Sequence, residues 1–306
     1  MLNMVGKREF GHCGGIQQTL ALILSAALLL GGAILPGPAC AQGLADLAPT
    51  AGRVDLGERV PASLAELTAY LDANPGLTQV DMYAAKLTAA QMDELAARYP
   101  GIRFGFTIRI AEHTVRTDAT AFSTLHNNKS KTHTTEDFSV LRHCRDLQAL
   151  DLGHNHITDI SFIAQLPKLK VLILACNEIT DISPLAQLQH LEYLELFKNH
   201  IADASPLAGL PGLVDLNLCF NNIADYRALY GLASLERLWI YSSNSYNYKT
   251  PLPEGLATSL REALPSCYVD DVSYSTLGGW RKHPRYDIIF DIFKTGVYKP
   301  WDKKAS

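Results

Sequence analysis

Cysteine is scarce in this chain of 306 residues, which contains only six. Two of them, Cys13 and Cys40, lie near the N-terminus, and the other four are spread singly along the rest of the sequence. No C-x-x-C pair occurs. This absence excludes the cysteine spacing that is typical of structural zinc sites.

Charge is also low, at 19% of residues, with a formal net charge of −4, while 47% of residues are hydrophobic. This composition excludes a disordered chain and is typical of a globular protein with a continuous core. The charge is uneven, because residues 276–306 carry seven Lys and Arg against three Asp, and residues 43–275 are strongly acidic. The acidic middle of the chain argues against a nucleic-acid partner.

The one long apolar run lies at the N-terminus, at residues 19–35, after Lys7 and Arg8 and before Ala39-Cys40-Ala41. This pattern is typical of a secretory signal cleaved after Ala41. Two alternatives stay open: an uncleaved membrane anchor, because 17 residues are near the lower limit for a span, and lipid attachment at Cys40. In all three cases we expect the rest of the chain to be secreted or held in the cell envelope, with a membrane contact only through this segment.

A short hydrophobic phrase recurs every 22 residues and ends each time in asparagine. The four copies are LQALDLGHNHI (147–157), LKVLILACNEI (169–179), LEYLELFKNHI (191–201) and LVDLNLCFNNI (213–223), and a fifth, LERLWIYSSN (235–244), has Ser243 at the asparagine position. The pattern L-x-x-L-x-L-x-x-N-x-L/I predicts a leucine-rich repeat solenoid. We expect a parallel β-sheet on the concave face, short α or 3₁₀ turns on the convex side, and a cap at each end.

The asparagines at this position, Asn155, Asn177, Asn199 and Asn221, have a structural explanation. An amide can donate to and accept from the backbone of neighbouring coils, so it pairs polar groups that burial would otherwise leave unpaired. After each asparagine comes a phrase such as ITDISPLAQL. Ser183-Pro184 and Ser205-Pro206 suit the N-cap and first residue of a short helical turn. The sequence therefore predicts a structural asparagine ladder.

Four regions follow from these patterns. Residues 1–41 are the signal or anchor, 42–146 are divergent helix-bearing repeats with a cap, 147–244 are the regular repeats, and 245–306 are a C-terminal cap with a basic aromatic tail. In the second region we expect strands near 54, 80 and 104, helices at 63–75 and 88–100, a hairpin within 102–120 and a helix near 136–143. In the last we expect helices at 254–265 and 285–295 and a strand at 267–274, with the tail hiding the core of the last coil.

Residues 147–244 closely resemble the 22-residue repeats of internalin-like bacterial leucine-rich repeat proteins. The resemblance implies an exported protein that binds other proteins through its concave sheet face. The chain departs from that group in having no LPxTG-type sorting motif and no hydrophobic C-terminal anchor. Attachment to the cell wall is therefore not predicted.

The strand register predicts which side chains face outward on the concave sheet. Aromatic and arginine side chains on such a face have the composition of interface hot spots. We therefore predict a partner-binding surface, with the alternative that a terminal segment folds over it. The predicted surface comprises Asp151, Tyr193, Glu195, Phe197, Asp215, Arg237, Trp239 and Tyr241.

Other chemistries have weaker support. His154, His156 and His200 lack a converging carboxylate cluster, and Cys176 and Cys219 lack a base and an orienting group for nucleophilic catalysis. The two cysteines lie two coils apart, about 10 Å, which exceeds disulfide reach, and we expect Cys144 and Cys267 to be unpaired as well. The cationic aromatic segment 280–286 suits either packing of the cap or binding of a polyanion.

We therefore expect a protein without catalytic residues, metal or cofactor that recognises a protein or peptide through its concave face. Two alternatives remain. A glycan or cell-wall binding module would use the exposed aromatic residues as stacking platforms. An effector enzyme is disfavoured, because only 31 residues follow position 275, too few for a separate catalytic domain.

Overall fold

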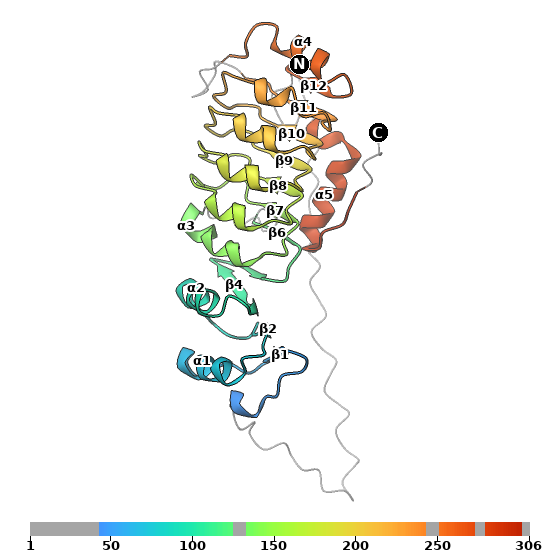
Figure 1. Ribbon diagram of the computed structural model, residues 1–306. Coiled ribbons are helices and arrows are strands. Elements are labelled where there is room, and N and C mark those ends of the chain that lie inside the picture. The colour runs from blue at the N-terminus through green and yellow to red at the C-terminus, as the bar shows by residue number, and fades with distance from the viewer. Residues whose placement is uncertain (1–42, 125–132, 243–250, 273–278, 302–306) are drawn as a thin grey trace, which may run out of the picture. The chain divides into compact units, whose positions relative to one another are not determined.

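The computed structural model describes residues 43–124, 133–242, 251–272 and 279–301 (Figure 1). The predicted signal or anchor, residues 1–41, lies outside the described residues, and residues 41–306 form one compact unit. In the part of the chain that the structure describes, no helix has the length and apolar character needed to cross a membrane.

The first coils bear helices, as predicted. A 3₁₀ turn, η1 (Leu44–Asp46), precedes β1 (Arg53–Asp55), α1 (Leu64–Ala73), β2 (Gln79–Asp81), α2 (Ala89–Arg98) and β3 (Arg103–Gly105). Ser63 caps α1 by accepting a hydrogen bond from the Glu66 backbone N–H, and Thr88 forms a capping box with Gln91 at the start of α2. The three strands pair in parallel in the order β1, β2, β3.

A hairpin separates this sheet from the next one. Strands β4 (Thr107–Ile110) and β5 (His113–Arg116) pair antiparallel, and Ala111 adopts a positive φ of 48° between them. The chain then enters β6 (Ala121–Ser123), the first strand of the second sheet. The predicted hairpin is thus present, and residues 103–105 before it belong to β3 instead.

The second sheet has seven parallel strands in sequence order. After β6 come α3 (Thr135–Phe138) and the 3₁₀ turn η2 (Ser139–His143). The strands that follow are β7 (Ala149–Asp151), β8 (Val171–Ile173), β9 (Tyr193–Glu195), β10 (Asp215–Asn217), β11 (Arg237–Trp239) and β12 (Tyr268–Asp270). Each pairs with its neighbour at a shift of one repeat, for example Tyr193 with Asp215 and Asp215 with Arg237.

The convex side of the regular repeats carries the short 3₁₀ turns η3 (Ser161–Gln165), η4 (Ser183–Gln187), η5 (Ser205–Gly209) and η6 (Arg227–Leu229). The prediction that Ser183 and Ser205 cap these turns is wrong, because both serines lie inside the turns and make no cap bond of their own. The aspartate two residues earlier does so: Asp181 accepts the Ser183 N–H at 2.8 Å, and Asp203 accepts the Ser205 N–H at 2.8 Å. The aspartates that recur every 22 residues therefore supply the side-chain oxygen that accepts a backbone N–H at the start of each turn.

The predicted asparagine ladder is present beneath the sheet. The Asn177 amide donates to the carbonyls of Leu152 and Leu174, both at 3.0 Å, and accepts the Ile157 N–H at 3.1 Å. Asn199 and Asn221 repeat this pattern one and two coils later. Each buried asparagine thus links its own coil to the preceding one, and this pairs backbone groups that no strand or helix satisfies.

The C-terminal part adds α4 (Leu256–Ala263), strand β12, the 3₁₀ turn η7 (Trp280–Lys282) and α5 (Pro284–Thr295). Gly296 ends α5 with a left-handed φ of 68°, the conformation that favours glycine at this position. The expected role of the tail is corrected by its location. Helix α5 packs against β6 and β7 on the sheet side, and Figure 1 shows it opposite the convex helical turns. It therefore covers the sheet face and not the core of the last coil.

Candidate functional site

The outward face of the seven-stranded sheet forms a second apolar cluster with the C-terminal tail. Here the tail means residues 279–301. Trp280 lies between two sheet aromatics, with ring centroids 5.3 Å from Tyr193 and 5.2 Å from Trp239. From α5 and beyond, Ile289, Ile292, Phe293 and Trp301 join the same cluster. The apolar stripe of α5 is therefore buried on the sheet.

The predicted exposure of the concave surface is wrong for most of its residues. Six of the eight are buried: Asp151 (4% exposed), Tyr193 (0%), Glu195 (2%), Asp215 (0%), Arg237 (6%) and Trp239 (3%). Phe197 and Tyr241 are half-buried, each packed edge-on against Phe220. The physical reason is that the tail packs over this face and buries its aromatic rings. The alternative in which a terminal segment folds over the face is the one the structure shows.

A buried ionic network fastens the tail to the sheet. Asp215 accepts hydrogen bonds from Arg237 at 2.9 and 2.8 Å and from Arg285 of α5 at 2.7 Å. Arg237 also donates to the Trp280 carbonyl at 3.1 Å, and Arg285 pairs with Glu236. Two guanidinium groups thus compensate a carboxylate that has no contact with water, as a buried charge requires.

Two further carboxyl groups lie under the tail. Glu195 accepts hydrogen bonds from the Trp280 indole N–H at 3.1 Å and from the Tyr193 hydroxyl at 3.3 Å. Asp151 accepts from the Gly153 N–H at 3.0 Å and from the Ser123 hydroxyl at 3.1 Å. Burial raises the pKa of Glu195 to about 7 and that of Asp151 to about 6. Burial thus outweighs the Trp280 hydrogen bond to Glu195 and the Arg281 charge, which act to lower these pKa values, and both groups titrate nearer to neutral pH.

Among the described residues, none of the cysteines and histidines considered for chemistry belongs to a group of three potential metal ligands. Cys144, Cys176, Cys219 and Cys267 are free thiols, and burial raises the pKa of each of them. A raised thiol pKa disfavours the thiolate that nucleophilic catalysis needs. His154 and His156 are exposed, and His156 pairs with Glu178 of the next coil.

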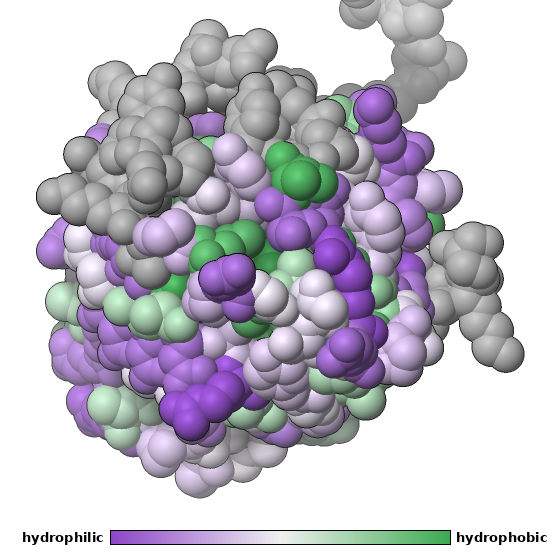
Figure 2. Space-filling view, turned by 90° about the horizontal axis from the view of Figure 1, so that it is seen from above, coloured by the Kyte–Doolittle hydropathy of each residue, from purple (hydrophilic) through white to green (hydrophobic). Residues whose placement is uncertain are grey.

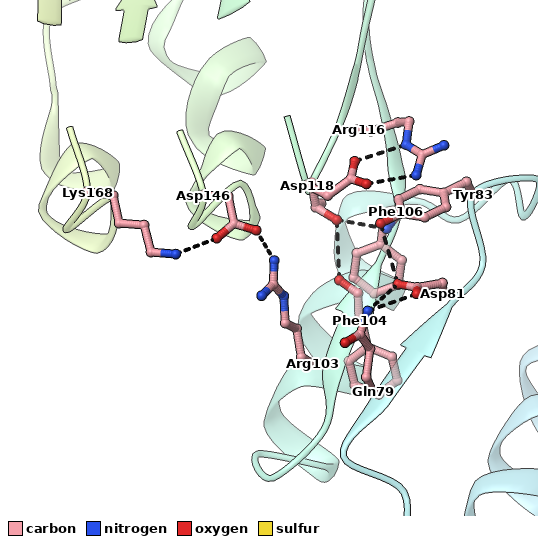
Figure 3. Close-up of polar contacts among 11 residues, drawn as sticks. Gln79, Asp81, Tyr83, Arg103, Phe104, Phe106, Arg116, Asp118, Asp146 and Lys168 are labelled. Carbon is pink, nitrogen blue, oxygen red and sulfur yellow. Dashed lines mark hydrogen bonds and ion pairs between the residues drawn. The ribbon is translucent and has the colours of Figure 1, made fainter. Parts of the chain in front are cut away.

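A different surface stays open on the three-stranded sheet and the hairpin. We call it the Tyr83 patch and define it as Gln79, Asp81, Tyr83, Arg116 and Asp118 (Figure 3). The Gln79 amide donates to both oxygens of Asp81, at 3.1 and 2.8 Å. The Arg116 guanidinium lies 3.5 Å from the Tyr83 ring centre and donates to Asp118 at 2.9 and 2.7 Å. These side chains are preorganised while they remain accessible.

Gly105 explains how the patch closes over β3. A Cβ atom at this position would lie 2.4 Å from an oxygen of Asp81 and 2.7 Å from the end of the Tyr83 ring. Only glycine at this position therefore allows the Asp81 and Tyr83 side chains to pack directly against β3. Burial, followed by the charges of Asp81 and Asp118, raises the pKa of Tyr83 to about 12, so its hydroxyl stays protonated. The sequence gives no signal for this patch, because the repeats here lack the asparagine phrase.

The rest of the described surface is largely polar. The large hydrophobic side chains with high exposure among the described residues are Val60, Tyr268, Val272, Phe290 and Val297. Viewed from above, hydrophobic residues form small patches among hydrophilic ones (Figure 2). Of the aromatic residues that suggested a glycan platform, Tyr193 and Trp239 are inside the molecule and Phe197 and Tyr241 are half-buried, which removes the basis for that alternative.

Comparison with known proteins identifies the repeats. Residues 145–187 match the family model described as leucine-rich repeats in two copies, and residues 187–205 match the model described as a leucine-rich repeat. Residues 145–205 are leucine-rich repeats. Together with the parallel seven-stranded sheet and its 3₁₀ turns, this match confirms the predicted leucine-rich repeat solenoid.

This leucine-rich repeat chain is similar to several solved bacterial structures. Internalin C2 of Listeria monocytogenes is 27% identical with a TM-score of 0.35, over 57% of this chain and 65% of that one. Internalin F of the same organism is 22% identical with a TM-score of 0.41, over 67% and 57%. A leucine-rich repeat protein of Leptospira interrogans is 20% identical with a TM-score of 0.43, over 66% and 50%. The chain thus matches between 50% and 65% of the length of these structures. No curated protein sequence matches it significantly.

Proposed function

We propose that this chain is an exported leucine-rich repeat protein that recognises a protein partner, and that the Tyr83 patch is its recognition surface. Leucine-rich repeats commonly bind proteins. The observation that carries the proposal is the contrast between the two sheets. The outer face of β6–β11 is covered by the chain's own tail, whereas Gln79, Asp81 and Tyr83, on or just after β2, stay half-buried, with the exposed Arg116 of the hairpin stacked on the Tyr83 ring.

The composition of the patch supports protein recognition. Tyrosine and arginine are enriched at interface hot spots, because they combine a large apolar area with hydrogen-bonding groups. Arg116 and Tyr83 already hold each other through a cation–π contact, which reduces the side-chain entropy lost on binding. The acidic Asp81 and Asp118 favour a partner segment that carries lysine or arginine.

The buried concave residues have a different proposed role. Tyr193, Glu195, Asp215, Arg237 and Trp239 are proposed to seat the tail, and an external partner would reach them only after displacing it. The molecule is proposed to bind its partner through a rigid surface that is complementary to the partner, with no covalent chemistry. No catalytic residue is proposed.

A binding comparison tests the patch. The full chain, immobilised, is exposed to surface extracts of bacteria and of host cells, and the wild type is compared with the Tyr83→Ala, Arg116→Ala double variant. The matched control is Arg227→Ala, because Arg227 likewise pairs with an aspartate two residues away, Asp225, but lies on the convex side. A protein band lost in the double variant and kept in the control supports the proposal. If both variants keep the band, the recognition surface lies elsewhere on the molecule.

Export is tested separately by intact-mass analysis of the chain isolated from its native host. The N-terminal pattern supports a mature chain that begins at Gln42. A mass that retains residues 1–41 would show an anchored chain, and a diacylglyceryl adduct on Cys40 would show a lipoprotein.

A further inference from the structure

Two buried histidines lie together where the hairpin meets the first coil of the second sheet. His113, the first residue of β5, is 5% exposed, and His133, just before α3, is 4% exposed. Their rings meet nearly at right angles, with centroids 5.8 Å apart. Both Nε2 atoms are buried without a hydrogen-bond partner. Since buried polar atoms are nearly always paired, two such atoms side by side call for an explanation.

A carboxylate lies beside the two rings. Glu112 has an exposed side chain, and its Oε1 lies 3.7 Å from His113 Nε2. One potential ligand atom from each of Glu112, His113 and His133 lies within 4.8 Å of the other two, and among the described residues this is the one such group of three. Two imidazoles and one carboxylate form a ligand set that suits zinc and related divalent transition metals.

From this arrangement we propose that Glu112, His113 and His133 form a binding site for a divalent transition metal ion of the zinc class. Zinc binds histidine nitrogen and carboxylate oxygen at about 2.0–2.2 Å, so the ligand atoms must draw closer together on binding. Glu112 provides that movement, because its side chain is exposed and lies at the turn of the hairpin. The three side chains leave one position of a tetrahedral site for water.

The backbone of the site is already fixed. The His133 N–H donates to the ladder residue Asn155 at 2.9 Å, and its carbonyl accepts the His156 N–H at 2.8 Å. His113 pairs with Ile110 across the hairpin. On the far side of His133, Asp137 Oδ2 lies 3.9 Å from Nδ1, the place of a carboxylate that orients a metal-bound imidazole. The ion would join the hairpin, which separates the two sheets, to the first coil of the second sheet, which Asn155 links to the next repeat.

Metal binding is tested on the untagged full chain, stripped with chelator, supplied with zinc sulfate and exchanged into metal-free buffer. We expect one zinc per chain by elemental analysis, a rise in Tm on adding zinc, and intense d–d absorption bands with cobalt(II), which indicate a tetrahedral site with nitrogen and oxygen ligands. A wild-type chain that retains no zinc and shows no Tm shift overturns the proposal. In that case the two rings are ordinary core histidines.

Three variants locate the ion. His133→Gln should lose the zinc and the zinc-dependent rise in Tm. Glu112→Gln alters an exposed side chain, so the fold is kept, and zinc affinity should fall at least tenfold. Asp137→Asn should weaken binding by about 10- to 100-fold, as loss of an orienting partner does. His156→Gln is the control, because this exposed histidine pairs with Glu178 instead. Zinc binding that survives in Glu112→Gln and disappears in His156→Gln overturns the assignment.

Discussion

Arg285 in α5 donates a 2.7 Å hydrogen bond to Asp215 in β10, although 70 residues separate them in the chain. Both side chains are buried, at 1% and 0% exposure. The tail is therefore fastened to the sheet by a charge pair that formed only because α5 folds back over the concave face. The same contact is the reason why residues chosen for an external partner instead face the chain itself.

The first prediction concerns this pair. Arg285→Met should lower the free energy of unfolding by about 3 kcal/mol, because it removes one of the two guanidinium groups that compensate buried Asp215. The measurement is denaturant unfolding at neutral pH. Arg281→Met, which alters an exposed arginine of the same tail, should stay within about 0.5 kcal/mol of wild type. If the two substitutions lower the free energy of unfolding equally, the Arg285–Asp215 pair does not hold the tail on the sheet.

The second prediction is a pH dependence caused by Glu195. Its pKa is about 7 when folded, against an ordinary value of 4.5, so the folded state binds the proton more tightly than the unfolded state. Stability from this group is therefore fully present below pH 4.5 and is lost as the pH rises through about 7. The loss is on the order of 3 kcal/mol. Asp151 acts in the same direction, with a folded pKa of about 6.

Glu195→Gln separates this effect from other titrations. Burial lowers the pKa of His113, His143 and His283, so these groups oppose the trend below about pH 6.5. Glutamine keeps an oxygen for the Trp280 N–H and carries no charge. The variant should therefore gain stability over wild type as the pH rises from 5 to 8, measured by denaturant unfolding at each pH. A difference that does not change with pH would show that Glu195 titrates normally.

The third prediction tests the asparagine ladder. Asn177→Ala removes two donors and one acceptor from buried backbone groups, and each group left unpaired costs about 1–3 kcal/mol. Because each coil contacts only its neighbours, the loss should extend to adjacent repeats. Asn222→Ala, next to Asn221 but outside the ladder, is the control. An unchanged thermal melt for Asn177→Ala would refute the ladder.

The repeats could be predicted from sequence because each local rule recurs. Asparagine, leucine and aspartate return every 22 residues, so strands, convex turns and the ladder follow from one phrase. The helices 64–73 and 89–98 were found through their caps at Ser63 and Thr88. Such signals are local, and the structure agrees with them to within a few residues.

The location of the tail could not be predicted in the same way. Ile289, Ile292 and Phe293 form an apolar stripe on α5, but the sequence of such a stripe does not indicate which surface it covers. The open end of the last coil and the aromatic concave face were both available. The Arg285–Asp215 pair decides between them, and it joins residues whose sequence neighbours give no sign of the contact. The His113 and His133 pair was missed for the same reason, since their spacing matches no metal motif.

The last prediction concerns Trp239, whose expected role has changed. As an exposed binding residue it could be removed without loss of stability. Because Trp239 is 3% exposed and its ring centroid lies 5.2 Å from that of Trp280, Trp239→Ala should lower the free energy of unfolding by about 3–5 kcal/mol. Leu238→Ala, on the opposite side of the same strand, should cost about 2–5 kcal/mol. Phe290→Ala, at 52% exposure on α5, is the control and should change little.

A double-mutant cycle then tests whether the tail is the cause. Trp239→Ala and Trp280→Ala each remove one ring of the same contact, so their combined cost should be smaller than the sum of the single costs by about 0.5–1.5 kcal/mol, the coupling typical of an aromatic pair. Denaturant unfolding of the four proteins measures it. If the two costs add within about 0.5 kcal/mol, the rings do not meet in solution. The tail then leaves the sheet open, and Tyr193 and Trp239 return as candidates for binding an external partner.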